Sequence, residues 1–213
     1  MKGLMAVATE YTEEFYNTIT DGSERSALAM ADLIRAWTLD FTSLIDVGCG
    51  KGVWSRVFKD KYDCEVLGVD GDYVTDPVVP FMAHDLTQPL ILDQTYDIAL
   101  CLEVAEHLPE ESADTIVDSL VNASDTIIFS AAIPFQTGAG HINCQWQSYW
   151  AKKFQDRGYD CDDVLRHIFW NDTRVEPWYK QNMLVYYKND GERLPLPNMI
   201  DVVHPEIHYW GRA

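Results

Sequence analysis

A glycine-rich turn stands early in the chain, in the segment Asp46-Val47-Gly48-Cys49-Gly50-Lys51-Gly52. Glycine lets the backbone turn sharply after a strand and approach a ligand without a Cβ atom in the way. Asp70 stands 24 residues after Asp46, where the next strand is expected to end. A carboxylate at that place can accept hydrogen bonds from both ribose hydroxyls of an adenosine-containing cofactor. The spacing therefore indicates a cofactor site that recognises adenosine.

Other nucleotide sites explain this turn less well. The nicotinamide and flavin fingerprint needs a glycine at position 53, where this chain has Val53. A phosphate-binding P-loop needs Ser or Thr after its lysine, but Lys51 is followed by Gly52. A sulfonium amino acid carries no phosphate groups and does not need such a loop. A tight strand-to-helix turn without any ligand is the remaining alternative.

Carboxyl and imidazole groups follow two later strand ends. Glu103, Glu106 and His107 come after the fourth predicted strand, and His141 comes after the fifth. Open α/β sheets keep their sites at the carboxyl ends of the strands, so the two histidines are expected to converge. Neutral histidine is a suitable general base for an alcohol, which makes His107 and His141 candidate catalytic residues. We expect Glu103 and Glu106 to raise the histidine pKa, because negative charge favours the imidazolium.

Two alternatives stay open for this constellation. Glu103, Glu106, His107 and His141 could together hold a divalent metal ion that binds two vicinal hydroxyls of an acceptor. Glu106 or His107 could instead cap the turn after the strand and take no part in chemistry. Residue types and spacing alone do not decide between a base, a metal site and a structural role.

The order of the predicted elements is that of a parallel α/β fold. Strands are expected at 43–47, 65–70, 80–84, 96–102 and 126–132, with helices at 53–59 and 111–121. Two helices are expected before them, at 9–20 and 24–39, with a break at Asp21-Gly22-Ser23. After residue 133 we expect a helix at 146–157, strands near 161–169 and 182–188, and an irregular tail from 191. Alternating strands and helices with short links favour a parallel sheet with right-handed crossovers.

The length of 213 residues suits one domain over 1–213. Within it we distinguish an N-terminal helical segment (1–40), a cofactor-binding half (41–132) and a substrate-side half with the tail (133–213). The sequence shows no internal repeat and no low-complexity tract that would divide it further.

Net charge and cysteine content limit which partners and which cell compartment are expected. The chain has 16 basic and 34 acidic residues, a net charge of −18, which repels polyanions. Duplex nucleic acid and membrane are therefore not expected as partners, and a small-molecule substrate is; the oligomeric state is not predicted. The 5 cysteines form no CxxC pair, and no stretch has the form of a signal peptide or membrane helix. A cytoplasmic location is expected.

Four segments together resemble the motifs of class I S-adenosylmethionine-dependent methyltransferases. "LIDVGCGKG" resembles motif I, "VLGVD" motif II, "AHDL" motif III and "YDIALCLEVAEHLP" motif IV, in the family's order over residues 43–132. The resemblance implies S-adenosylmethionine as the cofactor and S-adenosylhomocysteine as its product. It also implies a Rossmann-like sheet of seven strands in the order 3-2-1-4-5-7-6, with strand 7 antiparallel and helices on both faces. The segment "NMLVYYK" fits that last strand.

The same resemblance implies a role for individual residues in holding the cofactor. They are Asp46 at the methionine amino group, Gly48, Cys49 and Gly50 along the turn, Asp70 at the ribose, Asp85 and Leu86 at the adenine, and Leu102 and Glu103 beside the methionine portion. Lys51 stands where such families often carry Thr or Ser, which is a mild departure from the pattern.

The predicted function is methyl transfer to a small polar acceptor, with a sugar or nucleotide-sugar-like hydroxyl as the favoured target. Aromatic residues such as Trp178 and Tyr179 suit sugar rings. The Glu-x-x-Glu-His pattern also resembles the metal-binding set of small-RNA 2′-O-methyltransferases and a run in ubiquinone-pathway O-methyltransferases. This implies a metal-dependent O-methyltransferase as an alternative, although −18 conflicts with RNA. A non-catalytic cofactor-binding or regulatory protein would lack working groups at 107 and 141, where this chain keeps histidines.

Overall fold

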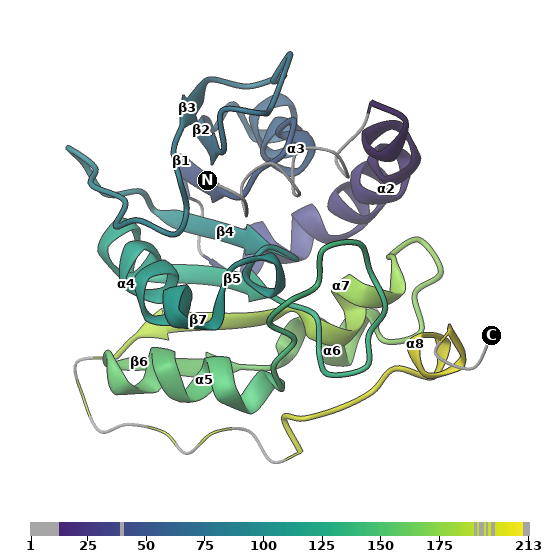
Figure 1. The fold of residues 1–213 in the computed structure, drawn as a ribbon. Coiled ribbons are helices and arrows are strands. Elements are labelled where there is room, and N and C mark those ends of the chain that lie inside the picture. The colour runs from purple at the N-terminus through teal and green to yellow at the C-terminus, as the bar shows by residue number, and fades with distance from the viewer. Residues whose placement is uncertain are drawn as a thin grey trace.

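A central β-sheet with helices on both faces forms the fold (Figure 1). The computed structural model describes residues 13–38, 41–189, 191, 194, 196 and 199–210. The strands are β1 (Ser43–Val47), β2 (Glu65–Asp70), β3 (Phe81–Ala83), β4 (Ile98–Leu102), β5 (Thr126–Ser130), β6 (Tyr159–Asp162) and β7 (Leu184–Lys188). The helices are α2 (Glu13–Trp37), α3 (Val53–Tyr62), α4 (Ala113–Ala123), α5 (Gln147–Asp156), α6 (Val164–Phe169), α7 (Pro177–Asn182) and α8 (Pro205–Trp210).

The sheet has seven strands in the order β3-β2-β1-β4-β5-β7-β6. Strands β1 to β5 pair in parallel, whereas β7 lies antiparallel between β5 and β6. Helix α3 joins β1 to β2 and α4 joins β4 to β5, whereas loops join β2 to β3 and β3 to β4. This confirms the predicted Rossmann-like order and the antiparallel seventh strand.

Both faces of the sheet are buried, which explains the nearly continuous apolar runs of the central strands. Successive strand residues point to opposite faces, so Ile45 packs in one hydrophobic cluster and Leu44 in the other. On the first face, Phe129 of β5 packs against Trp150 and Phe154 of α5. Helices α4 and α5 cover this face, and α2, α3, α6 and α7 pack in the cluster on the opposite face (Figure 1).

The predicted helix break at Asp21-Gly22-Ser23 is wrong, because α2 runs through it without interruption. A Cβ atom at Gly22 would overlap the carboxylate of Glu176, so the glycine gives room to a docking side chain rather than a turn. That docking is held by an ion pair between Arg25 and Glu176 and by the Glu176 N–H, which donates to the Ser26 hydroxyl at 3.0 Å. Tertiary contacts thus outweigh the low helix propensity of glycine. Residues 9–12 of the predicted first helix lie outside the described residues.

The prediction of a strand near 161–169 is only partly right. Strand β6 ends at Asp162, and the next residues form helix α6. Arg166 of this helix is buried, forms an ion pair with Asp163, and donates to the Ile200 carbonyl at 2.8 Å. The short helices α7 and α8 were not predicted, and α8 lies within the tail expected to be irregular.

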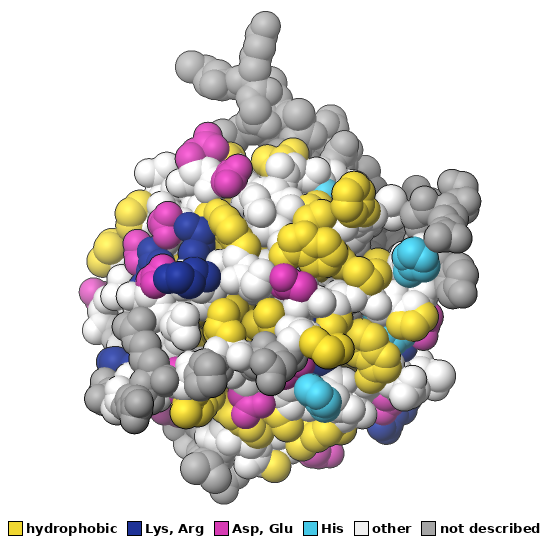
Figure 2. Space-filling view, turned by 90° about the horizontal axis from the view of Figure 1, so that it is seen from below, with side chains coloured by type: hydrophobic (Ala, Val, Ile, Leu, Met, Phe, Trp, Pro, Cys, Tyr) yellow, Lys and Arg dark blue, Asp and Glu magenta, His cyan; other side chains and the backbone are white. Residues whose placement is uncertain are grey.

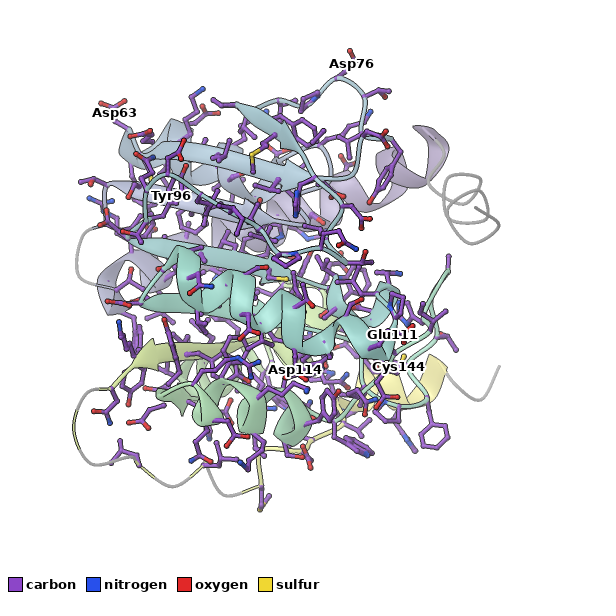
Figure 3. All side chains as sticks on the ribbon, turned by 60° about the vertical axis from the view of Figure 1, so that its left-hand side comes forward. Asp63, Asp76, Tyr96, Glu111, Asp114 and Cys144 are labelled. Carbon is purple, nitrogen blue, oxygen red and sulfur yellow. The ribbon has the colours of Figure 1, made fainter. Side chains whose placement is uncertain are left out.

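The parallel strands place their two ends at opposite sides of the molecule (Figure 3). Asp63 and Tyr96 precede strands β2 and β4 and lie on one side, while Asp76, Glu111 and Cys144 follow strands and lie on the other. Loops that leave the carboxyl ends of the parallel strands therefore share one edge of the sheet. No helix within the described ranges combines the length and the apolar character that a bilayer crossing needs.

Candidate functional site

A cleft of about 1250 Å³ opens at the carboxyl ends of the parallel strands. Sequence analysis singled out residues from five separate segments, and the structure brings all of them to the wall of this one cleft. They are Asp46, Gly48, Cys49, Gly50, Asp70, Asp85, Leu86, Leu102, Glu103, Glu106, His107 and His141. The convergence is a finding, whereas the role of each residue stays a prediction.

The glycine-rich turn after β1 is tied to the end of β2. Gly48 has a positive φ of 81°, and its N–H donates to the Val69 carbonyl at 2.7 Å. A Cβ atom at this position would overlap the side chain of Val104. Gly50 has a φ of 55°, and its N–H donates to Oδ2 of Asp70 at 2.7 Å. The turn therefore needs glycine for both its backbone conformation and its close packing.

Asp70 at the end of β2 is held in a fixed orientation. Its Oδ1 accepts hydrogen bonds from the Gly71 N–H at 2.7 Å and from the Tyr73 hydroxyl at 2.6 Å. A carboxylate has about four acceptor positions, so these bonds together with that from Gly50 leave capacity for a ribose hydroxyl. Sequence reasoning missed Tyr73, although it lies only three residues after Asp70.

Asp46 is a buried carboxyl group whose Oδ2 has no hydrogen-bond partner. Burial raises its pKa to about 7, and the nearby charge of Asp70 adds to this, while a hydrogen bond with Ser55 opposes it. An ammonium group in the cleft would supply the missing partner and favour the ionised carboxylate. The lone oxygen therefore fits the methionine amino group of the expected cofactor.

The segment after β3 forms the far wall of the cleft. Asp85 Oδ1 accepts bonds from the N–H and the hydroxyl of Thr87, at 3.0 and 2.7 Å. Leu86 is buried beside it and offers an apolar surface. This combination of a fixed carboxylate and an aliphatic wall is compatible with an adenine ring.

Glu103 follows Leu102 at the end of β4 in a left-handed conformation, with a φ of 56°. Its N–H donates to the Ser130 carbonyl at 2.9 Å, which holds the strained residue against β5. Its carboxyl oxygens accept bonds from the side-chain amides of Gln136 at 3.2 Å and Asn182 at 3.1 Å. Burial raises the pKa of Glu103 to about 7 despite these bonds.

A cluster of buried amides supports Glu103 from behind. Oε1 of Gln136 accepts bonds from the amide of Gln181 at 2.9 Å and from that of Asn182 at 3.1 Å. Gln136 comes from the loop after β5, and the other two come from α7. Sequence reasoning missed all three, since amide side chains far apart in the chain carry no motif.

The imidazole rings of His107 and His141 lie against each other at the wall of the cleft. Their rings form a T-shaped pair with centroids 5.0 Å apart. Nδ1 of His107 lies 3.3 Å from the Gly140 carbonyl, and Nδ1 of His141 lies 3.2 Å from the Gln136 carbonyl. A carbonyl can only accept, so each bond requires a proton on Nδ1 and makes Nε2 the basic nitrogen when the ring is neutral.

The expected rise in the histidine pKa is wrong. Burial lowers the pKa of His107 to about 4, and repulsion from His141 lowers it further. Burial also lowers the pKa of His141, against its hydrogen bond to Gln136. Loss of solvation lowers the histidine pKa more than the nearby carboxyl groups raise it. Those carboxyl groups are themselves buried, and burial favours their uncharged form. Both imidazoles are therefore neutral at physiological pH.

Glu106 is completely buried beside the histidines, and its carboxyl oxygens form no hydrogen bond of good geometry, although the Glu103 carboxyl and the backbone N–H groups of Glu106 and Ala132 lie within reach. Burial holds its pKa well above the usual range, and the charge of Glu103 adds to this. One ligand atom each from Glu106, His107 and His141 lie within 4.8 Å of one another, the one such cluster among the described residues. Glu103, also predicted for a metal site, is not part of it.

The cleft is acidic. Its lining carries seven carboxyl side chains, from Asp46, Asp70, Asp72, Asp85, Glu103, Glu106 and Glu111. Lys51 is the one lysine or arginine among the described residues that line it. Elsewhere basic side chains lie next to acidic ones: the largest group of Lys and Arg on the face of Figure 2 is bordered by Asp and Glu. Ion pairs such as Lys153 with Asp114 illustrate this.

Comparison with known proteins places this geometry in context. Residues 22–121 match the family model of a methyltransferase domain. A search of curated protein sequences finds no match. Among solved structures, DesVI from Streptomyces venezuelae is similar with a TM-score of 0.64 and 14% identity, over 83% of this chain and 96% of that one.

Two further structures share the fold at low identity. Magnesium protoporphyrin IX methyltransferase from Synechocystis PCC 6803, solved with bound S-adenosylhomocysteine, has a TM-score of 0.56 and 19% identity, over 78% of this chain and 84% of that one. The methyltransferase domain of the bacterial protein CtHen1 also has a TM-score of 0.56 and 19% identity, over 78% of this chain and 99% of that one.

Proposed function

We propose that this chain is a class I S-adenosylmethionine-dependent methyltransferase and that it transfers a methyl group to a hydroxyl of a small polar acceptor. One observation carries the choice of a hydroxyl. Two neutral imidazoles, each with Nδ1 bonded to a backbone carbonyl, meet on the acceptor side of the cleft. An alcohol must lose its proton on methylation, and Nε2 of a neutral histidine can accept it.

S-adenosylmethionine supplies a methyl group already activated by the positive sulfonium. The protein's task is then to align the acceptor oxygen with that methyl group and to exclude water. Asp46 and Asp70 support this by fixing the amino and ribose ends of the cofactor, and Glu103 borders the reacting centre from the end of β4.

His141 is the general base in this proposal. A bond from Nδ1 to a backbone carbonyl raises the basicity of each ring, but only His107 is also weakened as a base by repulsion from its partner. His107 then orients the acceptor. Because burial lowers both pKa values, the turnover rate should reach half of its maximum below pH 6.5 rather than at that value.

The acidic lining narrows the acceptor class. A nucleotide diphosphate sugar would bring two phosphates into a cleft in which, even with protons on Asp46, Glu103 and Glu106, the other four carboxyl side chains outnumber the one lysine, and this disfavours that part of the sequence-based prediction. A sugar-like polyol carries no such charge and can pack its ring against Trp178 at the cleft wall.

A metal-dependent form of the same reaction is the second candidate. It is favoured by the buried carboxyl group of Glu106, which lies next to a ligand nitrogen of each histidine. Glu106, His107 and His141 would hold a divalent cation such as manganese, whose charge would lower the pKa of an acceptor hydroxyl. Glu106 would then be ionised, and the cost of its burial would be offset by the cation.

The test incubates the protein with isotope-labelled cofactor and a pool of sugars, and identifies methylated products by mass spectrometry. The proposal expects a methyl group on oxygen and a loss in turnover of about 10²–10⁴-fold in His141→Ala, with unchanged cofactor affinity. Methylation of nitrogen, or near-normal turnover in both His141→Ala and His107→Ala, would exclude a histidine base.

Chelation separates the two candidates. Loss of activity with chelator, its return with manganese, and calorimetric binding of manganese that disappears in Glu106→Gln would establish the metal-dependent form. Full turnover in excess chelator would exclude the metal-dependent form and support the histidine base.

A further inference from the structure

Hydrogen-bond donors from three helices gather at one end of the cleft. The hydroxyls of Ser23 in α2 and Tyr179 in α7 lie 3.0 Å apart. The indole of Trp54 in α3 packs edge-on against Tyr179, with ring centroids 5.0 Å apart. All three residues line the cleft. We refer to Ser23, Trp54 and Tyr179 as the donor cluster.

The donor cluster has more donors than acceptors. Trp54 is only 6% exposed, and its indole N–H forms no hydrogen bond of good geometry, although it lies near enough to the Tyr179 hydroxyl to lower the pKa of that group. The bond between the hydroxyls of Ser23 and Tyr179 uses one of their two hydrogens. Burial raises the pKa of Tyr179 to about 12 against the effect of Ser23, so its hydroxyl stays protonated and able to donate. Buried donors without acceptors are costly, so this arrangement is suited to an anionic ligand.

The start of α3 adds to this preference. The helix begins at Val53, directly after Gly52, and no side chain caps it. The first N–H groups of a helix have no partner inside it, and the helix dipole favours negative charge there. The first turn of α3 carries no acidic residue that would satisfy these groups. An anion bound beside Trp54 would accept hydrogen bonds from these N–H groups.

Asp46, whose carboxyl group suits a cation rather than an anion, lies next to the donor cluster. Ser55, the neighbour of Trp54 in sequence, hydrogen-bonds with Asp46. Asp46 in turn offers a buried oxygen without a partner, which suits an ammonium group. One end of the cleft therefore presents an acceptor for a cation beside donors for an anion, the complement of an α-amino acid.

We propose that Ser23, Trp54 and Tyr179 bind the α-carboxylate of the methionine part of the cofactor, while Asp46 binds its ammonium group. The assignment rests on the cofactor of the proposed function and is independent of the acceptor. Tyr179 lies outside residues 22–121, the segment that matches the family model, so the motif comparison could not have identified it.

The test compares S-adenosylmethionine with its decarboxylated analogue, which lacks only the carboxylate. Calorimetry measures the Kd of both ligands for the wild type, Tyr179→Phe and Trp54→Phe, variants that keep the aromatic packing. We expect each variant to bind S-adenosylmethionine about 10- to 100-fold more weakly, the effect of losing one hydrogen bond to a charged group. The Kd of the decarboxylated analogue should change less than about 2-fold, well below the loss expected for one such bond.

Partial misfolding would weaken the binding of both ligands equally. The ratio of the two Kd values therefore separates misfolding from a loss of carboxylate binding. Tyr159→Phe is the matched control, because its hydroxyl bonds to the Ser124 carbonyl at 2.8 Å and does not line the cleft. Equal losses for both ligands, or no loss for either, would overturn the inference while leaving the class of enzyme intact. A raised acceptor KM with unchanged cofactor Kd would assign the donors to an acceptor carboxylate and also overturn it. If the wild type bound neither ligand, the proposed function itself would fail.

Discussion

Burial sets the protonation of the groups that meet at the carboxyl end of β4. Asp46 and Glu103 have a pKa raised to about 7, and that of Glu106 is raised further, so these carboxyls hold protons that they would lose in water. His107 and His141 behave in the opposite way and remain neutral. The cleft is therefore less charged than its composition implies. A bound cation would lower the pKa of these carboxyl groups and so favour the ionised form that burial disfavours.

Asp70 offers the most direct test at the scale of single residues. Asp70→Ala removes the hydrogen bond from a ribose hydroxyl to a carboxylate, worth about 1.5–3 kcal/mol. The variant should therefore lose at least about 1.5 kcal/mol of binding free energy for S-adenosylhomocysteine in calorimetry. NAD should bind much less well than the cofactor to the wild type.

The structure adds a control to this prediction. Tyr73→Phe keeps the carboxylate but removes the hydroxyl that orients it, so it should cost less than Asp70→Ala. Unchanged affinity in Asp70→Ala would show that the ribose lies elsewhere.

At the scale of elements, local patterns were predictable and long-range ones were not. The turn at Gly48 and Gly50 was visible because its residues are consecutive and each has a backbone reason to be glycine. Gln136 and Asn182 were not, because they approach Glu103 from a loop and from α7, 33 and 79 residues away in sequence. The same limit explains the false break at Gly22, where the deciding partner is distant in the chain.

The contact between the glycine turn and the segment after β4 can be tested by a double-mutant cycle. Gly48→Ala should destabilise the fold by about 2–4 kcal/mol, because it combines a positive φ with overlap at Val104. Val104→Ala alone should destabilise it by about 1–3 kcal/mol through lost packing. Denaturant unfolding of both single variants and the double variant measures the coupling.

The double variant Gly48→Ala with Val104→Ala should be more stable than the sum of the single effects allows, because the overlap is gone while the backbone strain remains. Simple additivity would mean that the two segments do not press on each other in solution.

At the scale of the whole molecule, the cleft is assembled from much of the chain, from Ser23 in α2 to Tyr179 in α7. Division of 1–213 into one domain remains a prediction, but a site with walls from both halves needs those halves to pack as one unit. The buried carboxyls and histidines at this junction make the stability of the molecule depend on pH in two opposite directions.

The sign of each effect follows from the shifted pKa values. Asp46 and Glu103 titrate near pH 7 when folded and near 4 when unfolded, so in this range the folded state binds more protons and stability falls as pH rises. His107 titrates near pH 4 when folded and near 6.5 when unfolded, so stability falls as pH drops below 6.5. Between pH 6.5 and 8 the carboxyl effect dominates.

Raising the pH from 6.5 to 8 should therefore lower the free energy of unfolding by at least about 1–2 kcal/mol, because Glu106, whose pKa is raised further, adds to the two groups that titrate near pH 7. Guanidinium unfolding of the ligand-free protein at both pH values measures it, and guanidinium salt screens the general repulsion from the net charge of −18. Asp46→Asn removes one of these three carboxyl groups, so its drop should be smaller than that of the wild type by about 1 kcal/mol. The variant should also gain stability relative to the wild type as pH rises, because it no longer buries an ionised carboxylate. An equal drop in both proteins would mean that Asp46 is already ionised at pH 6.5, and the account of its unpartnered oxygen would be wrong.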